Sequence, residues 1–173
     1  MATAFRILST RLGPVGIVAG ESGLRRVYLP ERTVGGLRRR IKRDFPDADE
    51  RAALLPRVAD GLKRYFAGEA VAFDVPLDWD GASGFERAVW GACAQVRYGE
   101  TATYQELGER VGRPRAGRAV GSALARNPLP VVVPCHRVKR SDGGLGGYSG
   151  PGGVAFKRRL LEMEATARPE NRS

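Results

Sequence analysis

The most informative stretch of the chain reads Leu129-Pro130-Val131-Val132-Val133-Pro134-Cys135-His136-Arg137-Val138. An apolar run leads directly into a cysteine and a histidine, which predicts a strand that carries a reactive side chain to a sheet edge or cleft. His136 is the single histidine of the chain and Cys135 is one of two cysteines. A thiol with an ordinary pKa of about 8.5 is mostly protonated at neutral pH, and an adjacent imidazole raises the fraction of reactive thiolate. The pair is therefore a candidate activated nucleophile, the alternative being a buried, inert cysteine beside a chance polar residue.

Strand geometry limits how this pair can act. Successive side chains of a strand point to opposite faces, so Cys135 and His136 should not touch if the strand continues through them. The second cysteine, Cys93, falls in a predicted helix over 85–96 that is apolar along one stripe. We expect Cys93 to be a structural thiol of the core rather than a nucleophile.

Two short helices are predicted upstream of the nucleophile. The first starts near Thr103, with Thr101 or Thr103 as its cap, and the second spans 116–125 and consists largely of alanine and glycine. A short turn containing Gly112 joins them, which is typical of a helix-turn-helix, although any close-packed helix pair also favours small residues. Basic residues surround the pair and the cysteine: Arg110, Arg113, Arg115, Arg118, Arg126, Arg137, Lys139 and Arg140.

A glycine-rich loop and a last helix follow the nucleophile. Glycines recur from 143 to 153 around Tyr148 and Ser149, and their bare backbone allows close approach of a ligand. The alternative is a merely flexible surface loop. The last helix is predicted over 154–165, and the polar end over 166–173 is predicted to be frayed.

The chain before residue 81 predicts a small sheet with two helices, because short apolar runs alternate with turns and then give way to helical periodicity. The expected strands are 5–9, 16–19, 24–29 and 71–75, and the expected helices are 34–45 and 52–66. Turn residues at 76–84 mark a boundary. We therefore predict an N-terminal domain over 1–80, a C-terminal domain over 81–165 and the tail over 166–173.

The composition favours an anionic partner. The 173 residues include 29 Lys and Arg against 19 Asp and Glu, a net charge of +10, which fits nucleic acid or a membrane surface unless it only reflects codon or solubility bias. No apolar stretch is long enough to span a bilayer, and no secretory pattern opens the chain. One histidine and two cysteines cannot supply an ordinary zinc site, and they suggest a reducing cytoplasm. We expect no metal, no cofactor and no membrane partner.

The motifs of the second part also occur together in one known family. They read Gly99-Glu100-Thr101-Ala102-Thr103-Tyr104, Gly117-Arg118-Ala119-Val120-Gly121, Arg126-Asn127-Pro128, Pro134-Cys135-His136-Arg137-Val138 and Gly147-Tyr148-Ser149-Gly150. In order and spacing they closely resemble the methylated-DNA–protein-cysteine methyltransferases, the 6-O-alkylguanine-DNA alkyltransferases. The resemblance implies an α/β (α+β) fold. Its N-terminal domain would be a small ribonuclease-H-like sheet with helices. Its C-terminal domain would be mostly helical, with a winged helix-turn-helix-like DNA-binding motif and a short active-site strand.

The resemblance also implies the chemistry. Cys135 would take the alkyl group from 6-O-alkylguanine, and from 4-O-alkylthymine, in a single irreversible turnover. A water molecule would relay the thiol proton to His136, and Glu164 would hold the imidazole. Tyr104 would donate a proton to the leaving base, and Asn127 would brace the turn before the nucleophile.

The expected partner is double-stranded DNA containing an alkylated guanine, bound by a monomer, in the cytoplasm at the nucleoid; cooperative binding stays open. Arg118 would fill the gap left by a base flipped through the minor groove. The other residues implied to contact DNA are Thr103, Tyr104, Arg115, Ala119, Ser122, Ala125 and Arg126, and those implied to line the guanine pocket are Pro130, Val138, Tyr148 and Ser149.

The chain departs from the family pattern at three places. The segment after Ser149 is longer by about two residues, Arg159 stands where an aromatic residue is common, and Gly108 replaces a usual alanine. The insertion affects whether Glu164 aligns with the carboxylate that holds the imidazole in the family. The alternative interpretation is that Glu164 is a solvent-exposed acid of the last helix, like its neighbour Glu162.

Three other functions remain as alternatives. A lesion-binding protein on the same scaffold would bind alkylated bases without transfer, but such proteins lack the cysteine. A cysteine hydrolase using Cys135, His136 and Glu164 would leave the basic helix pair unexplained, and a plain DNA-binding regulator would leave the Cys-His pair unexplained.

Overall fold

The computed structural model describes residues 2–167 and divides them into two compact units, one reaching to Asp80 and the other spanning Gly81–Thr166. Of the tail predicted over 166–173, Thr166 still belongs to the last helix, and 168–173 lie outside the described residues. The mixed α/β fold, with a small N-terminal sheet unit and a helical C-terminal unit, is confirmed. Within the described part of the chain, no helix is both long and apolar enough to cross a membrane.

The N-terminal unit is built on a four-stranded sheet in the order β3-β2-β1-β4. The strands β1 (Ala4–Thr10), β2 (Gly13–Gly20) and β3 (Gly23–Tyr28) are joined by tight turns and pair antiparallel. The two-residue β4 (Asp49–Glu50), which the sequence did not suggest, pairs parallel with β1. Gly23 has a φ of +137°, and a Cβ there would lie 2.1 Å from the Pro76 carbonyl oxygen, so the chain that leaves the unit runs directly against this turn.

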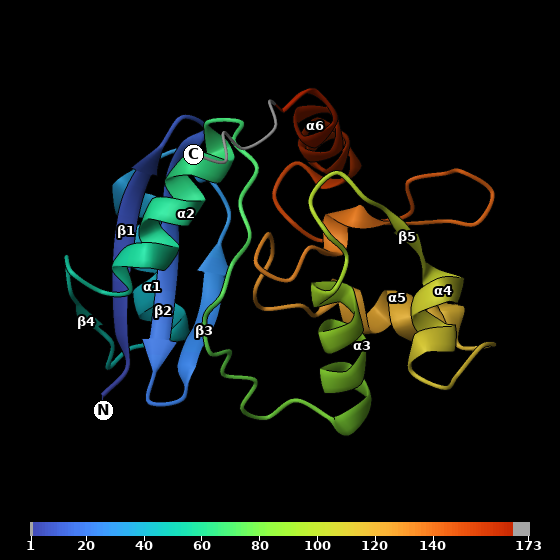
Figure 1. Cartoon of the computed structure of the whole chain (residues 1–173). Helices are drawn as coiled ribbons and strands as arrows, with labels where there is room; N and C mark the ends of the chain where they lie inside the picture. The colour runs from blue at the N-terminus through green and yellow to red at the C-terminus, as the bar shows by residue number, and fades with distance from the viewer. Residues whose placement is uncertain (1, 168–173) are drawn as a thin grey trace. The chain divides into compact units, whose positions relative to one another are not determined.

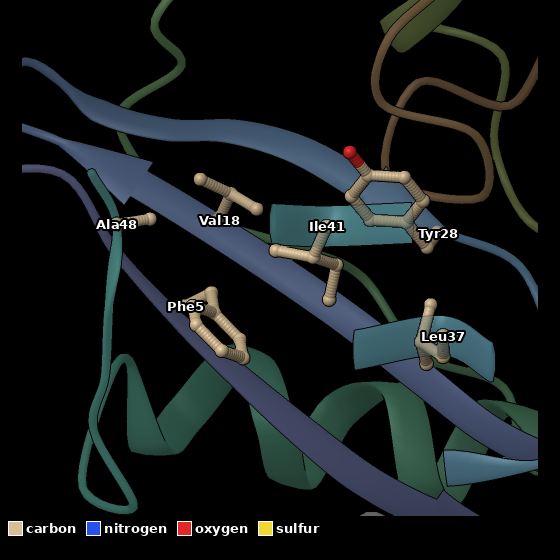
Figure 2. Close-up of a cluster of buried hydrophobic side chains, with 6 residues drawn as sticks. All are labelled: Phe5, Val18, Tyr28, Leu37, Ile41 and Ala48. Atoms are coloured by element: carbon tan, nitrogen blue, oxygen red, sulfur yellow. The ribbon is translucent and has the colours of Figure 1, made fainter. Parts of the chain in front are cut away.

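Two helices cover opposite faces of this sheet, α1 (Val34–Asp44) and α2 (Pro56–Phe66). Figure 1 shows α2 in front of the strands and α1 behind them. Figure 2 shows the side chains enclosed between the sheet and α1, among them Phe5, Leu37 and Ile41. Each large apolar side chain buried in this way contributes about 1.5–3 kcal/mol relative to exposure, so the unit has a hydrophobic core of its own.

Two predictions for this unit are wrong. The second helix begins at Pro56 rather than at 52, because Leu55 is left-handed, with a φ of 43°, and proline fits the first helical position, where its missing N–H is not needed. Residues 71–75 form no strand. The chain reaches the sheet edge only later, where Leu77 bridges Leu24 and the Asp78 N–H bonds the Leu24 carbonyl at 2.8 Å.

The C-terminal unit consists of α3 (Gly84–Ala94), α4 (Tyr104–Arg110), α5 (Gly117–Ala125) and α6 (Gly153–Thr166), with a small parallel ladder of β5 (Ala102–Thr103) and β6 (Val138–Lys139). α4 and α5 pack together as the predicted helix pair. Thr103 caps α4 through the Glu106 N–H at 3.0 Å, and the Glu106 carboxylate accepts the Thr103 N–H in return. The glycine at 108 has a local reason, because a Cβ there would lie 2.7 Å from the Arg113 carbonyl oxygen in the turn between the helices.

The strand predicted before the nucleophile does not form. Pro130 makes only an isolated bridge with Val133, Val131 is left-handed with a φ of 73°, and residues Cys135–Arg137 form a 3₁₀ turn, η1. Pro130 and Pro134 lack the N–H that a strand ladder requires. The short active-site strand is instead β6, which begins at Val138, directly after this turn.

Candidate active site

Cys135 opens onto a cavity of about 930 Å³ in the C-terminal unit and is only 8% exposed. The walls come from the start of α4, from α5 and from the glycine-rich loop. The lining residues are Tyr104, Gly117, Arg118, Gly121, Ser122, Leu124, Ala125, Cys135, Arg140, Gly146, Gly147, Tyr148 and Ser149. The structure therefore places one nucleophile at the wall of a cavity that is large enough for a planar base.

Asn127 braces the turn that carries the nucleophile. Its Nδ2 donates to the Val133 carbonyl at 2.8 Å, and its Oδ1 accepts the Leu129 N–H at 2.9 Å. Burial raises the pKa of the Cys135 thiol, while a hydrogen bond with Asn127 and the charge of Lys157 act to lower it. The side chain therefore both fixes the irregular backbone before the cysteine and favours the thiolate.

His136 and Glu164 are brought together as the resemblance implied. The His136 Nε2 lies 2.7 Å from the Glu164 Oε1, and both side chains are buried. A carboxylate can only accept, so Nε2 carries the proton and Nδ1 is the basic nitrogen of the neutral imidazole. Burial lowers the pKa of His136, against the opposing effect of Glu164, so the resting imidazole is neutral and able to accept a proton. The loop insertion has not displaced Glu164, whereas Glu162 is exposed.

Arg137 holds the other side of the same carboxylate and is not part of an open basic surface. Its Nε donates to the Glu164 Oε2 at 3.0 Å and its Nη2 to Oε1 at 2.9 Å, while Nη1 donates to the Val96 carbonyl at 2.8 Å. Burial opposes the ionisation of Glu164, but the hydrogen bonds from His136 and Arg137 outweigh it and lower the pKa of Glu164 to about 2. The sequence pattern counted Arg137 among the basic residues around the helix pair and the cysteine, but its charge is buried in this ion pair.

Lys157 is a site residue that the sequence reasoning missed. It is fully buried on α6, and its Nζ donates to the Val138 carbonyl at 2.6 Å, to the Gly147 carbonyl at 3.2 Å and to the Tyr104 hydroxyl at 3.4 Å. Burial lowers the pKa of Lys157 to about 8. Lys157, Leu160 and Glu164 recur at helical spacing on one face, and this periodicity is the signal that could have indicated its burial.

Tyr104 follows the Thr103 cap directly and lines the cavity, and burial raises the pKa of its phenol. The glycine-rich loop crosses close to the ring, because a Cβ on Gly146 would lie 2.5 Å from the Tyr104 hydroxyl. Tyr148 and Ser149 also line the cavity, and the Ser149 hydroxyl donates to the Ala125 carbonyl at 2.9 Å. This hydrogen bond ties the loop to the end of α5.

The remaining predicted residues divide into two groups. Arg118, Ser122 and Ala125 line the cavity from α5, and Arg118 is exposed. Arg115 and Ala119 are exposed but do not line the cavity. Thr103 serves as the helix cap, and Arg126 is ion-paired with Glu86 at 2.6 Å.

Pro130 and Val138 are not among the residues that line the cavity, and Val138 is fully buried in β6. Cys93 is buried in the core, and this burial raises the pKa of its thiol.

A basic helix pair beside a cavity with a supported cysteine defines a DNA-binding protein that carries a reactive thiol. The model of the 6-O-methylguanine DNA methyltransferase DNA-binding domain matches residues 84–166. The methylated-DNA–protein-cysteine methyltransferase of Methanosarcina acetivorans is 36% identical over 94% of this chain and 98% of its own.

Solved structures agree with this match. The crystal structure of the Mycobacterium tuberculosis O6-methylguanine methyltransferase is 36% identical, covers 98% of this chain and 96% of its own, and has a TM-score of 0.79. The same TM-score and identity hold for the Mycobacterium tuberculosis protein in complex with DNA, with 96% of each chain covered. The chain belongs to the methylated-DNA–protein-cysteine methyltransferase family and is a DNA-repair methyltransferase.

Proposed function

We propose that this protein removes the alkyl group from 6-O-alkylguanine in double-stranded DNA by transferring it to Cys135 in a single turnover. The observation that carries the proposal is the cavity, which Cys135 shares with Tyr104 and with the exposed Arg118 of α5. Cys135 would thus be the nucleophile and Tyr104 the proton donor, while Arg118 would contact the DNA. Two solved relatives support the same substrate. One is called an O6-methylguanine methyltransferase, and the other is in complex with DNA.

The reaction starts with the thiol. The Cys135 proton passes through a water molecule to the His136 Nδ1, since Nε2 already carries the proton that it donates to Glu164. The thiolate sulfur then attacks the alkyl carbon. A sulfur–carbon bond forms as the carbon–oxygen bond breaks, and the electron pair of that bond stays on guanine O6.

Tyr104 donates its proton to a ring nitrogen of the leaving guanine, which lowers the cost of releasing an anion. The imidazolium proton then restores the tyrosine. In sum, the thiol proton ends on guanine and the alkyl group ends on sulfur as a thioether. A thioether has no ready leaving group, so Cys135 reacts once.

The target base must leave the duplex before this reaction, because a thiol in a cavity cannot reach an alkyl group inside the base stack. Flipping a base costs a few kcal/mol. Arg118, exposed in the first turn of α5, would fill the gap, and the small residues of α5 would let the helix enter the minor groove. We extend the proposal to 4-O-alkylthymine as a second substrate and to a monomer that acts on the nucleoid in the cytoplasm.

The test uses duplex oligonucleotide containing 6-O-methylguanine in excess over the protein, followed by peptide masses. We expect one methyl group on Cys135, at most one per protein molecule, none in Cys135→Ser and full transfer in the Cys93→Ala control. Lesion binding without methylation would indicate a binding protein, and repeated turnover would indicate a hydrolase-like enzyme. Methyl on Cys93 would refute the assigned nucleophile.

A further inference from the structure

Lys157 is a buried cation whose hydrogen bonds all go to neutral oxygens. Its three acceptors are the Val138 and Gly147 carbonyls and the Tyr104 hydroxyl. Among residues 2–167, no carboxylate lies within ion-pair distance of its Nζ. Burying an ammonium group costs several kcal/mol even after relaxation, so a lysine held in this way calls for a role beyond packing.

The hydrogen-bonding capacity of an ammonium group settles the direction of the contact with Tyr104. The group has three donors and no acceptor, so the phenol oxygen must accept. The phenol proton of Tyr104 is therefore not used in the hydrogen bond with Lys157. Among the described residues, the Tyr104 hydroxyl donates no hydrogen bond to a protein acceptor, and the Val138 and Gly147 carbonyls beside it accept from Lys157. The direction left for it is the cavity that Tyr104 lines.

We infer that Lys157 is a positioning residue that directs the Tyr104 hydroxyl proton into the cavity and so makes the tyrosine a donor to the departing base. The inference rests on the proposed function, because it takes Tyr104 to be the proton donor in alkyl transfer. Without the ammonium group, the phenol oxygen would no longer be occupied as an acceptor, and its proton would no longer be directed toward the substrate.

The surroundings of Lys157 offer a second route by which it could act. The titratable groups that face it are Cys93 on α3, Tyr104 on α4, Cys135 and His136 on η1, and Lys139 on β6. Its charge therefore also favours the Cys135 thiolate. An experiment must separate an effect on the leaving base from an effect on the nucleophile.

Two reactions of the same thiol make this separation. Methyl transfer from 6-O-methylguanine DNA needs a proton for the leaving base, whereas alkylation of Cys135 by iodoacetamide releases iodide and needs none. We expect Lys157→Met to slow both reactions through the loss of thiolate, and to slow methyl transfer about 10- to 100-fold more than the iodoacetamide reaction, the scale of a misdirected proton donor. Arg158→Met removes the same charge from an exposed position of α6 and serves as the control.

A double-mutant cycle then links the two residues. Relative to the iodoacetamide reaction of the same variant, Tyr104→Phe should slow methyl transfer at least as much as Lys157→Met does. On the same relative scale, the double variant should show no larger loss than Tyr104→Phe alone. Additive effects, or an equal loss in the iodoacetamide reaction, would overturn the inference. An inactive wild type would instead refute the proposed function.

The wild-type protein gives a test that does not depend on folding of a variant. Both reactions share the titration of Cys135, so the ratio of their rates isolates the proton donor. This ratio should fall as the pH rises through about 8, where Lys157 loses its proton and its amine can accept from Tyr104. A ratio that stays constant from pH 7 to pH 9 would contradict the inference.

Discussion

Replacing Glu164 by glutamine would remove one charge from the buried group formed with His136 and Arg137 while keeping the shape of the side chain. In the folded protein the pKa of Glu164 is lowered from 4.5 to about 2. A lowering of this size corresponds to about 3 kcal/mol of folding stability at neutral pH. The variant also leaves the Arg137 guanidinium buried without its anion, and breaking a buried pair costs about 3–5 kcal/mol.

The dependence of this loss on pH gives the prediction its sign. The folded-state pKa of Glu164 is depressed, so its contribution to stability is complete above pH 4.5 and is lost as the pH falls toward 2. We therefore expect Glu164→Gln to be less stable than the wild type by about 3 kcal/mol at pH 7, with the difference shrinking steadily below pH 4.5.

Urea unfolding followed by tryptophan fluorescence between pH 7 and pH 3 measures this difference. Glu162→Gln is the matched control, since Glu162 is exposed on the same helix. A difference below about 1 kcal/mol at pH 7, the range of an exposed ion pair, would refute the reasoning. So would a difference that does not change with pH.

Two further predictions concern the cavity. Gly146→Ala should slow methyl transfer at least about 10-fold while sparing the iodoacetamide reaction of Cys135, because its Cβ would push against the Tyr104 hydroxyl and its φ is +72°. The control is Gly143→Ala, which also has a positive φ, of +89°, but has open space at its Cβ and lies outside the cavity lining. Equal rates of methyl transfer in the two variants would contradict this geometry. Arg118→Ala should slow repair of duplex DNA far more than reaction with free 6-O-benzylguanine, since only the duplex requires flipping; parallel losses on both substrates, measured as second-order rate constants, would argue against the role of Arg118.

The sequence predicted much of the fold because its local signals agree with one another. The three hairpin strands and the α4–α5 pair were predicted from turn residues and periodicity, with ends off by a few residues. Of the two candidate caps, Thr101 and Thr103, the structure uses Thr103. The prediction of a strand before Cys135 was wrong because it relied on the run of apolar residues. Pro130 and Pro134 lack the N–H that a strand ladder requires, so the strand does not form. The two-residue strands β4, β5 and β6 carry too little pattern to be found without their partners.

The site was predicted unevenly for a physical reason. Cys135, His136 and Glu164 belong to a recognisable motif, and the structure brings the last two within hydrogen-bond distance. The burial of Arg137 and Lys157 cannot be read from the charge pattern, because the sequence does not distinguish a basic residue that is exposed to solvent from one that is buried and hydrogen-bonded. Only the packing of α6 against η1 and the cavity loop distinguishes them.

The smaller of the two sheets among the described residues acts as a spacer between Tyr104, the proposed proton donor, and Cys135, the proposed nucleophile. β5 pairs with β6 at only two positions, Ala102 with Val138 and Thr103 with Lys139. The first of these strands runs directly into Tyr104, and the second directly follows the turn that holds Cys135. Two paired positions therefore fix the separation of Tyr104 and Cys135, which is the gap that the base of the proposed substrate would have to fit. A substitution that shifts this ladder by one residue would change that separation without replacing either side chain.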